Sequence, residues 1–72
     1  MNTEKIFIDD EFIKLDSLLK FSGVAETGGQ AKVLIQSGLV TLNGEVCTQR
    51  GKKIRSGDIV NFEDRSLEVC AR

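Results

Sequence analysis

The stretch "LDSLLKFSGVAETGGQAKVLIQSGLVTLNGEV", residues 15–46, carries the local signals that decide the fold. Its first apolar residues recur at the i, i+3, i+4 spacing of one helix face: Leu15, Leu18 and Leu19. This pattern predicts a short helix over residues 16–21. Asp16 is expected to cap the helix by accepting a free backbone N–H, and Gly23 is expected to end it because glycine readily takes a positive φ.

A second helix is predicted over residues 27–37. Thr27 and Gln30 have the spacing of a capping box, in which the two side chains accept backbone N–H groups at the helix start. The apolar residues again share one face: Ala31, Leu34 and Ile35. Lys32 falls on the opposite face, so we expect its ammonium group to be exposed.

Strand signals lie on both sides of the helices. The run "KIFI", residues 5–8, predicts a short N-terminal strand, because these apolar residues favour extended backbone. Asn43-Gly44 lies between two β-rich runs and best fits a two-residue type I′ turn, which predicts a hairpin over residues 39–48. The next segment, residues 48–54, is predicted to be an irregular loop.

A second pair of strands is predicted from "IVNFE" and "SLEVC", which lie on either side of Asp64-Arg65. The order is therefore strand, two helices, then three or four strands. This order predicts an α+β fold, with two short helices packed on one face of a small, mainly antiparallel sheet of four to five strands. A chain of 72 residues is expected to form a single domain over residues 1–72.

Composition argues against several classes of function. The chain has no histidine, the commonest general base, and we expect it to be neither an enzyme nor a cofactor-binding protein. Cys47 and Cys70 are too few for a disulfide framework or a zinc site, and we expect both to be reduced and mostly buried. No long apolar run or signal-peptide pattern is present, so no membrane association is expected and a cytoplasmic location is predicted.

The basic residues are concentrated in the middle of the chain. Residues 27–56 hold five basic residues and one acidic residue, although the formal net charge of the whole chain is -1. Four of the five basic residues fall within "QRGKKIR", residues 49–55, whereas residues 1–26 and 57–72 are both net acidic. Because the local field steers a charged partner, this distribution favours binding of a polyanion to the middle of the chain.

The ordered set of motifs resembles the RNA-binding domain named for ribosomal protein S four, also called the α-L motif. The matching residues are Leu15-Asp16, Gln30-Ala31-Lys32, Leu34-Ile35, Gly38, Val40, Leu42-Asn43-Gly44 and Gly57-Asp58-Ile59-Val60. The resemblance spans about residues 12–63 and is greatest to small, stand-alone bacterial members of the family. Gly28-Gly29 departs from the pattern, because many members have Ser-Arg at this place and use the arginine on RNA phosphate.

The resemblance implies a monomeric module that binds structured RNA, either ribosomal or transfer RNA, in ribosome assembly or translation. Phosphate contacts come from lysine, arginine, backbone N–H groups and helix N-termini. With the charge pattern, the resemblance implies an RNA-binding surface made of Gly28, Gly29, Gln30, Lys32, Asn43, Gln49, Arg50, Lys52, Lys53 and Arg55.

Readout of individual bases is expected to be weak. The chain has no tryptophan or tyrosine, and its phenylalanines fall in patterns typical of a core: Phe7, Phe12, Phe21 and Phe62. Single-strand binders stack bases on exposed aromatic rings, so we expect recognition of RNA shape and backbone with little sequence preference. Two alternatives are a protein–protein adaptor that uses the acidic ends and a small sulfur carrier. The C-terminal Cys-Ala-Arg argues against the carrier, which needs a terminal Gly-Gly.

Overall fold

The computed structural model describes residues 2–72 of the chain. These residues form two helices and seven strands, in the α+β arrangement that the sequence predicts. In chain order the elements are β1 (Asn2–Ile8), β2 (Ile13–Lys14), α1 (Leu15–Phe21), α2 (Gly28–Gln36), β3 (Val40–Leu42), β4 (Glu45–Val46), β5 (Lys53–Ile54), β6 (Ile59–Phe62) and β7 (Arg65–Ala71). None of the helices in this part of the chain is long and apolar enough to cross a bilayer.

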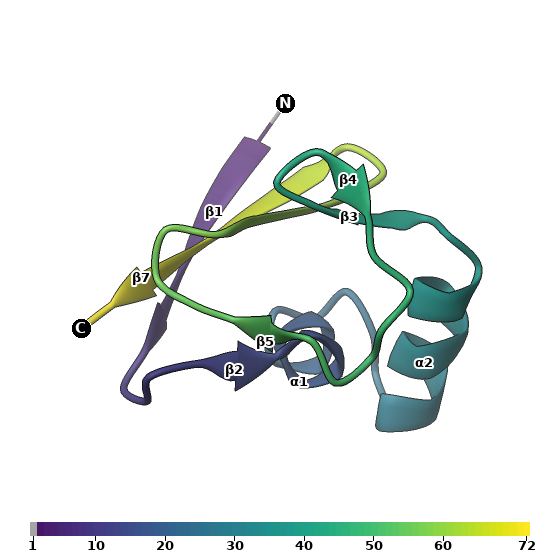
Figure 1. Ribbon diagram of the computed structural model, residues 1–72, viewed down its shortest axis with the longest axis horizontal. Helices are drawn as coiled ribbons and strands as arrows, with labels where there is room; N and C mark the ends of the chain where they lie inside the picture. Colours follow the sequence, from purple (N-terminus) through teal and green to yellow (C-terminus); the bar gives the residue numbers. More distant parts are fainter. Residues whose placement is uncertain (1) are drawn as a thin grey trace.

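Five strands form the main sheet, in the order β1-β7-β6-β3-β4. The pairs β7–β6, β6–β3 and β3–β4 are antiparallel, whereas β1 runs parallel to β7, with Ile6 opposite Val69. The prediction of a mainly antiparallel sheet is therefore confirmed. The two short strands β2 and β5 form a separate antiparallel pair beside α1 (Figure 1).

Helix α2 begins as its sequence predicts. Thr27 Oγ1 accepts the backbone N–H of Gln30 at 3.1 Å, and Gln30 Oε1 accepts the backbone N–H of Glu26 at 2.7 Å. The reciprocal bond thus reaches the residue before the cap instead of the cap itself. Of the N–H groups in the first turn, that of Gln30 is satisfied by a side chain, which leaves those of Gly28 and Gly29 to other partners.

Helix α1 begins differently from the prediction. Lys14 occupies the N-cap position without a side-chain cap, and Asp16 lies inside the first turn, so the prediction that Asp16 is the N-cap residue is wrong. Its carboxylate still accepts a backbone N–H of the first turn, since Asp16 Oδ1 accepts the N–H of Ser17 at 2.7 Å. Backbone carbonyls from a distant segment do the capping: Lys52 O accepts the N–H of Leu15 at 2.9 Å, and Arg50 O accepts the N–H of Asp16 at 3.1 Å. These bonds satisfy two N–H groups that have no partner within the helix.

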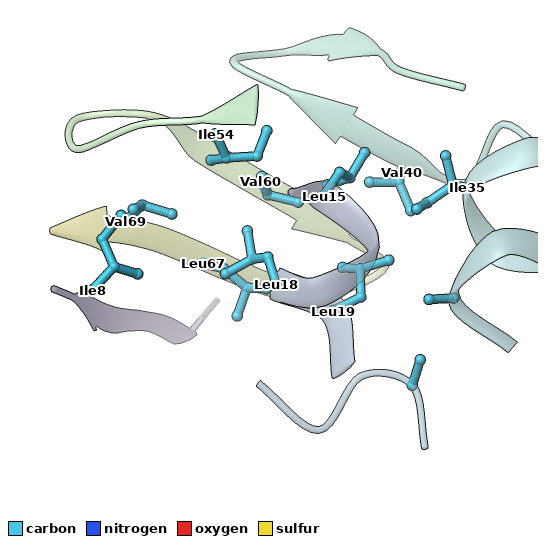
Figure 2. Packing of buried hydrophobic residues seen from close by; sticks show 12 residues of the cluster. Ile8, Leu15, Leu18, Leu19, Ile35, Val40, Ile54, Val60, Leu67 and Val69 are labelled. Atoms are coloured by element: carbon cyan, nitrogen blue, oxygen red, sulfur yellow. The ribbon is translucent and has the colours of Figure 1, made fainter. Parts of the chain in front are cut away.

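The core lies between the helices and the sheet. The three leucines of the predicted α1 face are each fully buried, and they pack with buried side chains from α2 and the strands (Figure 2). The largest fully buried side chains are Leu15, Leu18, Leu19, Ile35, Val40, Ile54, Val60, Leu67 and Val69. Burial of a leucine or isoleucine side chain contributes about 1.5–3 kcal/mol, so this one cluster is the main favourable contribution to the fold.

The two predicted hairpins are present, but the second turns earlier than predicted. Asn43 and Gly44 have φ angles of 52° and 89°, and both are positive, as a type I′ turn requires. In the second hairpin Phe62 lies opposite Arg65, so the turn is made by residues 63–64 and not by Asp64-Arg65. The guanidinium group of Arg65 binds Glu4 of β1, which holds this residue in β7.

Several side chains are more exposed than their sequence pattern suggests. Cys47 and Cys70 form no disulfide, but both are half-buried and not mostly buried as predicted. Phe7 is 47% exposed and Phe21 is 64% exposed, so their assignment to the core is wrong. Phe7 alternates with the buried Ile8 along β1, and Phe21 is the last residue of α1, beyond the leucines that face the core.

Candidate nucleic-acid interface

The basic segment, residues 49–55, crosses the start of helix α1. In Figure 1 the chain leaves β4, runs past α2, and turns toward β5 and the beginning of α1. The carbonyls of Arg50 and Lys52 are fixed by the N–H groups of Asp16 and Leu15, as described above. A backbone N–H of the segment is also used, because Lys52 N–H donates to Gln49 O at 3.1 Å. These bonds fix the backbone from which the cationic side chains extend, at the start of α1.

Part of the basic segment is a strand, which corrects the prediction of an irregular loop over residues 48–54. Lys53 and Ile54 form β5 and pair with Ile13 and Lys14 of β2. Ile54 is fully buried opposite Ile13. Burial of this one apolar side chain therefore holds the C-terminal end of the basic segment against the core. The residues between β4 and β5 remain irregular, in agreement with the prediction.

The strand pairing adds a lysine that sequence analysis missed. Lys14 lies directly opposite Lys53 in the β2–β5 ladder, and both side chains are exposed. Lys53 Nζ lies 4.8 Å from the centre of the Phe12 ring, and Arg55 Cζ lies 5.8 Å from it, which is cation–π geometry for both. No local signal links Lys14 to the basic segment, because only long-range pairing brings them together.

The two arginines of the basic segment contact carboxylates. Arg50 Nε lies 2.9 Å from Asp16 Oδ2, and Arg55 Nη1 lies 3.2 Å from Glu11 Oε1. A guanidinium group has five N–H donors, so each of these arginines keeps donors for another anion. Arg50 Nη2 also lies 3.8 Å from the point that a Cβ atom would occupy at Gly28, which puts the guanidinium group beside the start of α2.

Unlike the two arginines, the lysines of this region have no carboxylate partner among the described residues. Within the described part of the chain, Lys14, Lys32, Lys52 and Lys53 form no ion pair with a carboxylate. Lys32 is exposed on α2, four residues after Gly28, and residues at this spacing share a helix face. Lys32 and Arg50 therefore lie on the side of α2 that carries Gly28.

The remaining candidate residues on α2 have mixed availability. Gly29 is exposed, and the nearest atom to a Cβ built there is Thr27 Oγ1 at 3.9 Å, so its backbone is open to solvent. Gln30 uses its side-chain oxygen to accept the N–H of Glu26 and keeps only its NH2 group for another partner. The start of α2 therefore offers amide donors close to the guanidinium group of Arg50.

Asn43 and Gln49 lie in different environments. Asn43 Nδ2 donates to Asp58 Oδ1 at 3.1 Å, and its Oδ1 accepts the N–H of Ile59 at 2.9 Å. This side chain joins the two turns, and both of its polar atoms are engaged by other parts of the protein. Gln49 is exposed at the start of the basic segment, and the hydrogen bonds that it makes use its backbone oxygen.

Elsewhere the charged groups support the fold. Arg65 donates two hydrogen bonds of 2.8 Å to Glu4 and a third of 2.9 Å to the carbonyl of Ser22, which ties β7 to β1 and to the end of α1. The hydrogen bonds from Arg65 hold the pKa of Glu4 below its ordinary value, and Glu4 in turn raises the pKa of Arg65. Across residues 2–72, no three histidine, cysteine or acidic side chains gather as metal ligands.

Comparison with known proteins identifies relatives of this fold and sequence. The family model described as the S4 domain matches residues 6–70. The Escherichia coli (strain K12) protein named "Putative RNA-binding protein YbcJ" is 41% identical over 59 residues, which cover 82% of this chain and 84% of the relative. The Bacillus subtilis (strain 168) protein named "Probable ribosome maturation protein RlbA" is 40% identical over 58 residues, which cover 81% of this chain and 82% of the relative.

Solved structures agree with the sequence comparison. The solution structure of YbcJ from E. coli, described as revealing an α-L motif involved in RNA binding, matches with a TM-score of 0.69 and 36% identity over 96% of this chain and 86% of that chain. A crystal structure of a pseudouridylate synthase matches with a TM-score of 0.70 and 28% identity. This chain spans only 24% of that enzyme, so the likeness covers a part of it.

Proposed function

Because the chain belongs to the S4 domain family, we propose that it is an RNA-binding protein that holds the phosphates of structured RNA on one basic surface. We define this basic surface by its cationic residues: Lys14, Lys32, Arg50, Lys52, Lys53 and Arg55. The open N–H groups at Gly28 and Gly29 complete it, since a helix N-terminus also favours a phosphate. The observation that carries the proposal is the placement of Lys14 opposite Lys53, next to Lys52, without a carboxylate partner for any of the three.

Charge repulsion explains why such a cluster points to an anionic ligand. Like charges directly opposite one another destabilise a strand pair, so this arrangement does not serve the stability of the fold. A nearby phosphate relieves the repulsion and gains from several cations at once. The lysine ammonium groups act as mobile point charges, whereas the guanidinium groups of Arg50 and Arg55 keep free donors for a fixed contact.

Structured RNA suits this surface better than an extended single strand. The aromatic ring closest to the basic surface is that of Phe12, and it is covered by Lys53 and Arg55. The two exposed rings, Phe7 and Phe21, line a hollow together with Phe12, but Asp9 and Asp10 also line this hollow, and their carboxylates repel a phosphate. A surface of cations without a stacking platform fits recognition of RNA by backbone and shape.

The names of the relatives indicate which class of RNA to propose as the ligand. One relative is named a ribosome maturation protein, and another, YbcJ, carries RNA binding both in its name and in the description of its solved structure. We therefore propose ribosomal RNA first as the class of ligand, and transfer RNA second. We propose that the protein acts in the cytoplasm, as a monomer and without catalysis of its own. The pseudouridylate synthase does not argue otherwise, because the match covers only a minor part of that chain.

A measurement of RNA affinity against salt concentration tests the proposal. If four to five phosphates are neutralised, the slope of log K against log salt is about -3 to -4 for structured RNA. The probe is a hairpin RNA with a stem of about 16 base pairs, the length over which a double-stranded RNA presents two successive minor grooves. Binding that ignores salt, or no binding at low salt, contradicts the proposal and leaves the protein–protein adaptor as the alternative.

A further inference from the structure

A hollow of about 280 Å³ lies beside the basic surface, between the β3–β4 hairpin and the chain that follows it. Its lining includes the apolar side chains of Leu42 and Val46. Leu42 is half-buried and packs against the core, which makes this side of the hollow rigid. Val46 is 61% exposed, so a large apolar surface of this residue faces solvent with no cover from the described part of the chain.

The polar lining of the hollow offers both donors and acceptors. Glu45 contributes a carboxylate, Lys52 an ammonium group, and Thr48 and Gln49 contribute groups that can donate and accept. The hydrogen bonds given for this segment use the backbone oxygen of Gln49, so these four side chains stay free of protein partners among the described residues. By contrast, the nearby Asn43 and Arg50 are engaged by Asp58 and Asp16.

We propose that this hollow receives one unpaired nucleobase of the bound RNA, while the basic surface beside it holds the phosphates. The proposal rests on the proposed function, since it names a further contact of the same ligand. Lys52 belongs to both sites, so a nucleotide whose phosphate lies on the basic surface has its base within reach of the hollow.

The chemistry of the lining selects a base over a phosphate. A carboxylate repels phosphate but accepts from the N–H groups on a base edge, and the ammonium and amide groups donate to its carbonyls and ring nitrogens. The apolar side chains match the face of a planar ring. The volume of about 280 Å³ is slightly below the roughly 300–1,000 Å³ typical of sites for drug-sized ligands, so it is large enough for one base.

If the hollow binds a base, the protein prefers RNA helices that are interrupted by an unpaired nucleotide over continuous RNA helices. Recognition of RNA beyond shape generally uses bases that are unstacked in loops, bulges and ends, because these expose their edges. A continuous duplex keeps its bases paired, so it engages only the basic surface. An otherwise identical duplex with one bulged nucleotide engages the basic surface and the hollow together.

A comparison of two hairpin RNAs tests the proposal. The two probes share one stem, and a single bulged nucleotide, tested as each of the four bases, is added to one of them. We expect the protein to bind the best bulged hairpin about tenfold more tightly than the continuous one, which is within the range of a hydrogen-bonded contact to one base edge. The Thr48→Ala/Gln49→Ala variant is expected to lose this preference, so that it binds the bulged and the continuous hairpin with equal affinity.

A matched control separates the hollow from general effects. The Thr3→Ala/Gln36→Ala variant makes the same chemical changes at exposed positions on β1 and at the end of α2, and it is expected to keep the preference. Equal binding of bulged and continuous hairpins by the unaltered protein overturns the base-binding site while the proposed function stands. Loss of the preference in the control as well also overturns it. Failure to bind either RNA contradicts the proposed function itself.

Discussion

Lys14 and Lys53 lie directly opposite one another in the β2–β5 ladder, and neither has a carboxylate partner among the described residues. Cross-strand neighbours of like charge lower the stability of a strand pair, so the fold retains a repulsive contact at this position. The proposed function accounts for this contact, because a bound phosphate attracts both ammonium groups. The repulsion also makes stability and RNA binding respond to mutation in opposite directions.

The Lys14→Glu variant is expected to be more stable and to bind RNA less well. The new carboxylate faces Lys53 and stands at the N-terminus of α1, where a negative charge is favourable, so the free energy of unfolding is expected to rise by about 0.2–1 kcal/mol. The salt slope of RNA binding is expected to become shallower by about one. Urea denaturation and a salt titration measure the two effects. Lower stability together with unchanged RNA affinity argues against a role for this lysine pair.

Asp16 is expected to limit the charge that Arg50 offers to RNA. The Asp16→Asn variant removes the carboxylate that lies 2.9 Å from Arg50 Nε, so RNA affinity at low salt is expected to rise. Stability is expected to fall by up to about 1 kcal/mol, because Arg50 is partly exposed and its ion pair is screened by water. The matched control is Asp64→Asn, which makes the same change in net charge in the turn after β6. A rise in affinity of the same size in the control implies that only net charge matters.

The Asn43 side chain is expected to matter for folding and not for RNA. The Asn43→Ala variant loses the bonds to Asp58 and Ile59 and puts alanine at a φ of 52°, which alanine adopts poorly. An unpaired N–H group and a strained turn each cost about 1–3 kcal/mol, so the melting temperature is expected to fall clearly. At a temperature where the variant is folded, its RNA affinity is expected to equal that of the original protein. A selective loss of affinity assigns Asn43 to the RNA contact.

The ion pair between Glu4 and Arg65 predicts a specific pH dependence of stability. The pKa of Glu4 is lowered in the folded protein by the hydrogen bonds from Arg65, so the folded state holds this proton less tightly than the unfolded chain does. The stabilisation is therefore present above the ordinary pKa of 4.5 and is lost as pH falls through the lowered value. Compared with Glu4→Gln, the original protein is expected to melt at a higher temperature at neutral pH, and this difference is expected to shrink in acid. A difference that stays constant with pH excludes ionisation of Glu4 as its cause.

Local signals in the sequence were sufficient for most of the fold. The leucine spacing of α1, the Thr27 cap and the Asn43-Gly44 turn depend on residues within a few positions of one another, and the structure confirms all three. The missed features depend on distant partners. Asp16 looks like the N-cap residue in isolation, but the carbonyls of Arg50 and Lys52 do the capping, and the Asp16 carboxylate accepts from the N–H of Ser17 and from Arg50.

The same distinction holds for the candidate site. The clustering of cations in residues 49–55 is visible in the sequence, but their surroundings are not. Lys14 joins the surface only through the pairing of β2 with β5, and the approach of Arg50 to Gly28 depends on how the segment crosses the two helices. The exposure of Phe21 likewise depends on where α1 ends relative to the core, which periodicity does not reveal.

The central claim is that a localised basic surface, and not overall charge, binds RNA. Two charge-reversal variants test it: Lys52→Glu/Lys53→Glu within the basic surface, and Lys5→Glu/Lys20→Glu at exposed positions on β1 and in the last turn of α1. Both variants make the same change in net charge. Circular dichroism checks that each remains folded.

The deciding measurement is the affinity of both variants for the same hairpin RNA over a range of salt concentrations. We expect Lys52→Glu/Lys53→Glu to lose far more affinity than Lys5→Glu/Lys20→Glu, and its salt slope to become shallower by about two, one for each lost phosphate contact. The slope of the second variant is expected to remain at the original value. Equal losses of affinity in two folded variants, with equal slopes, contradict the account and show that the basic segment is not the RNA contact.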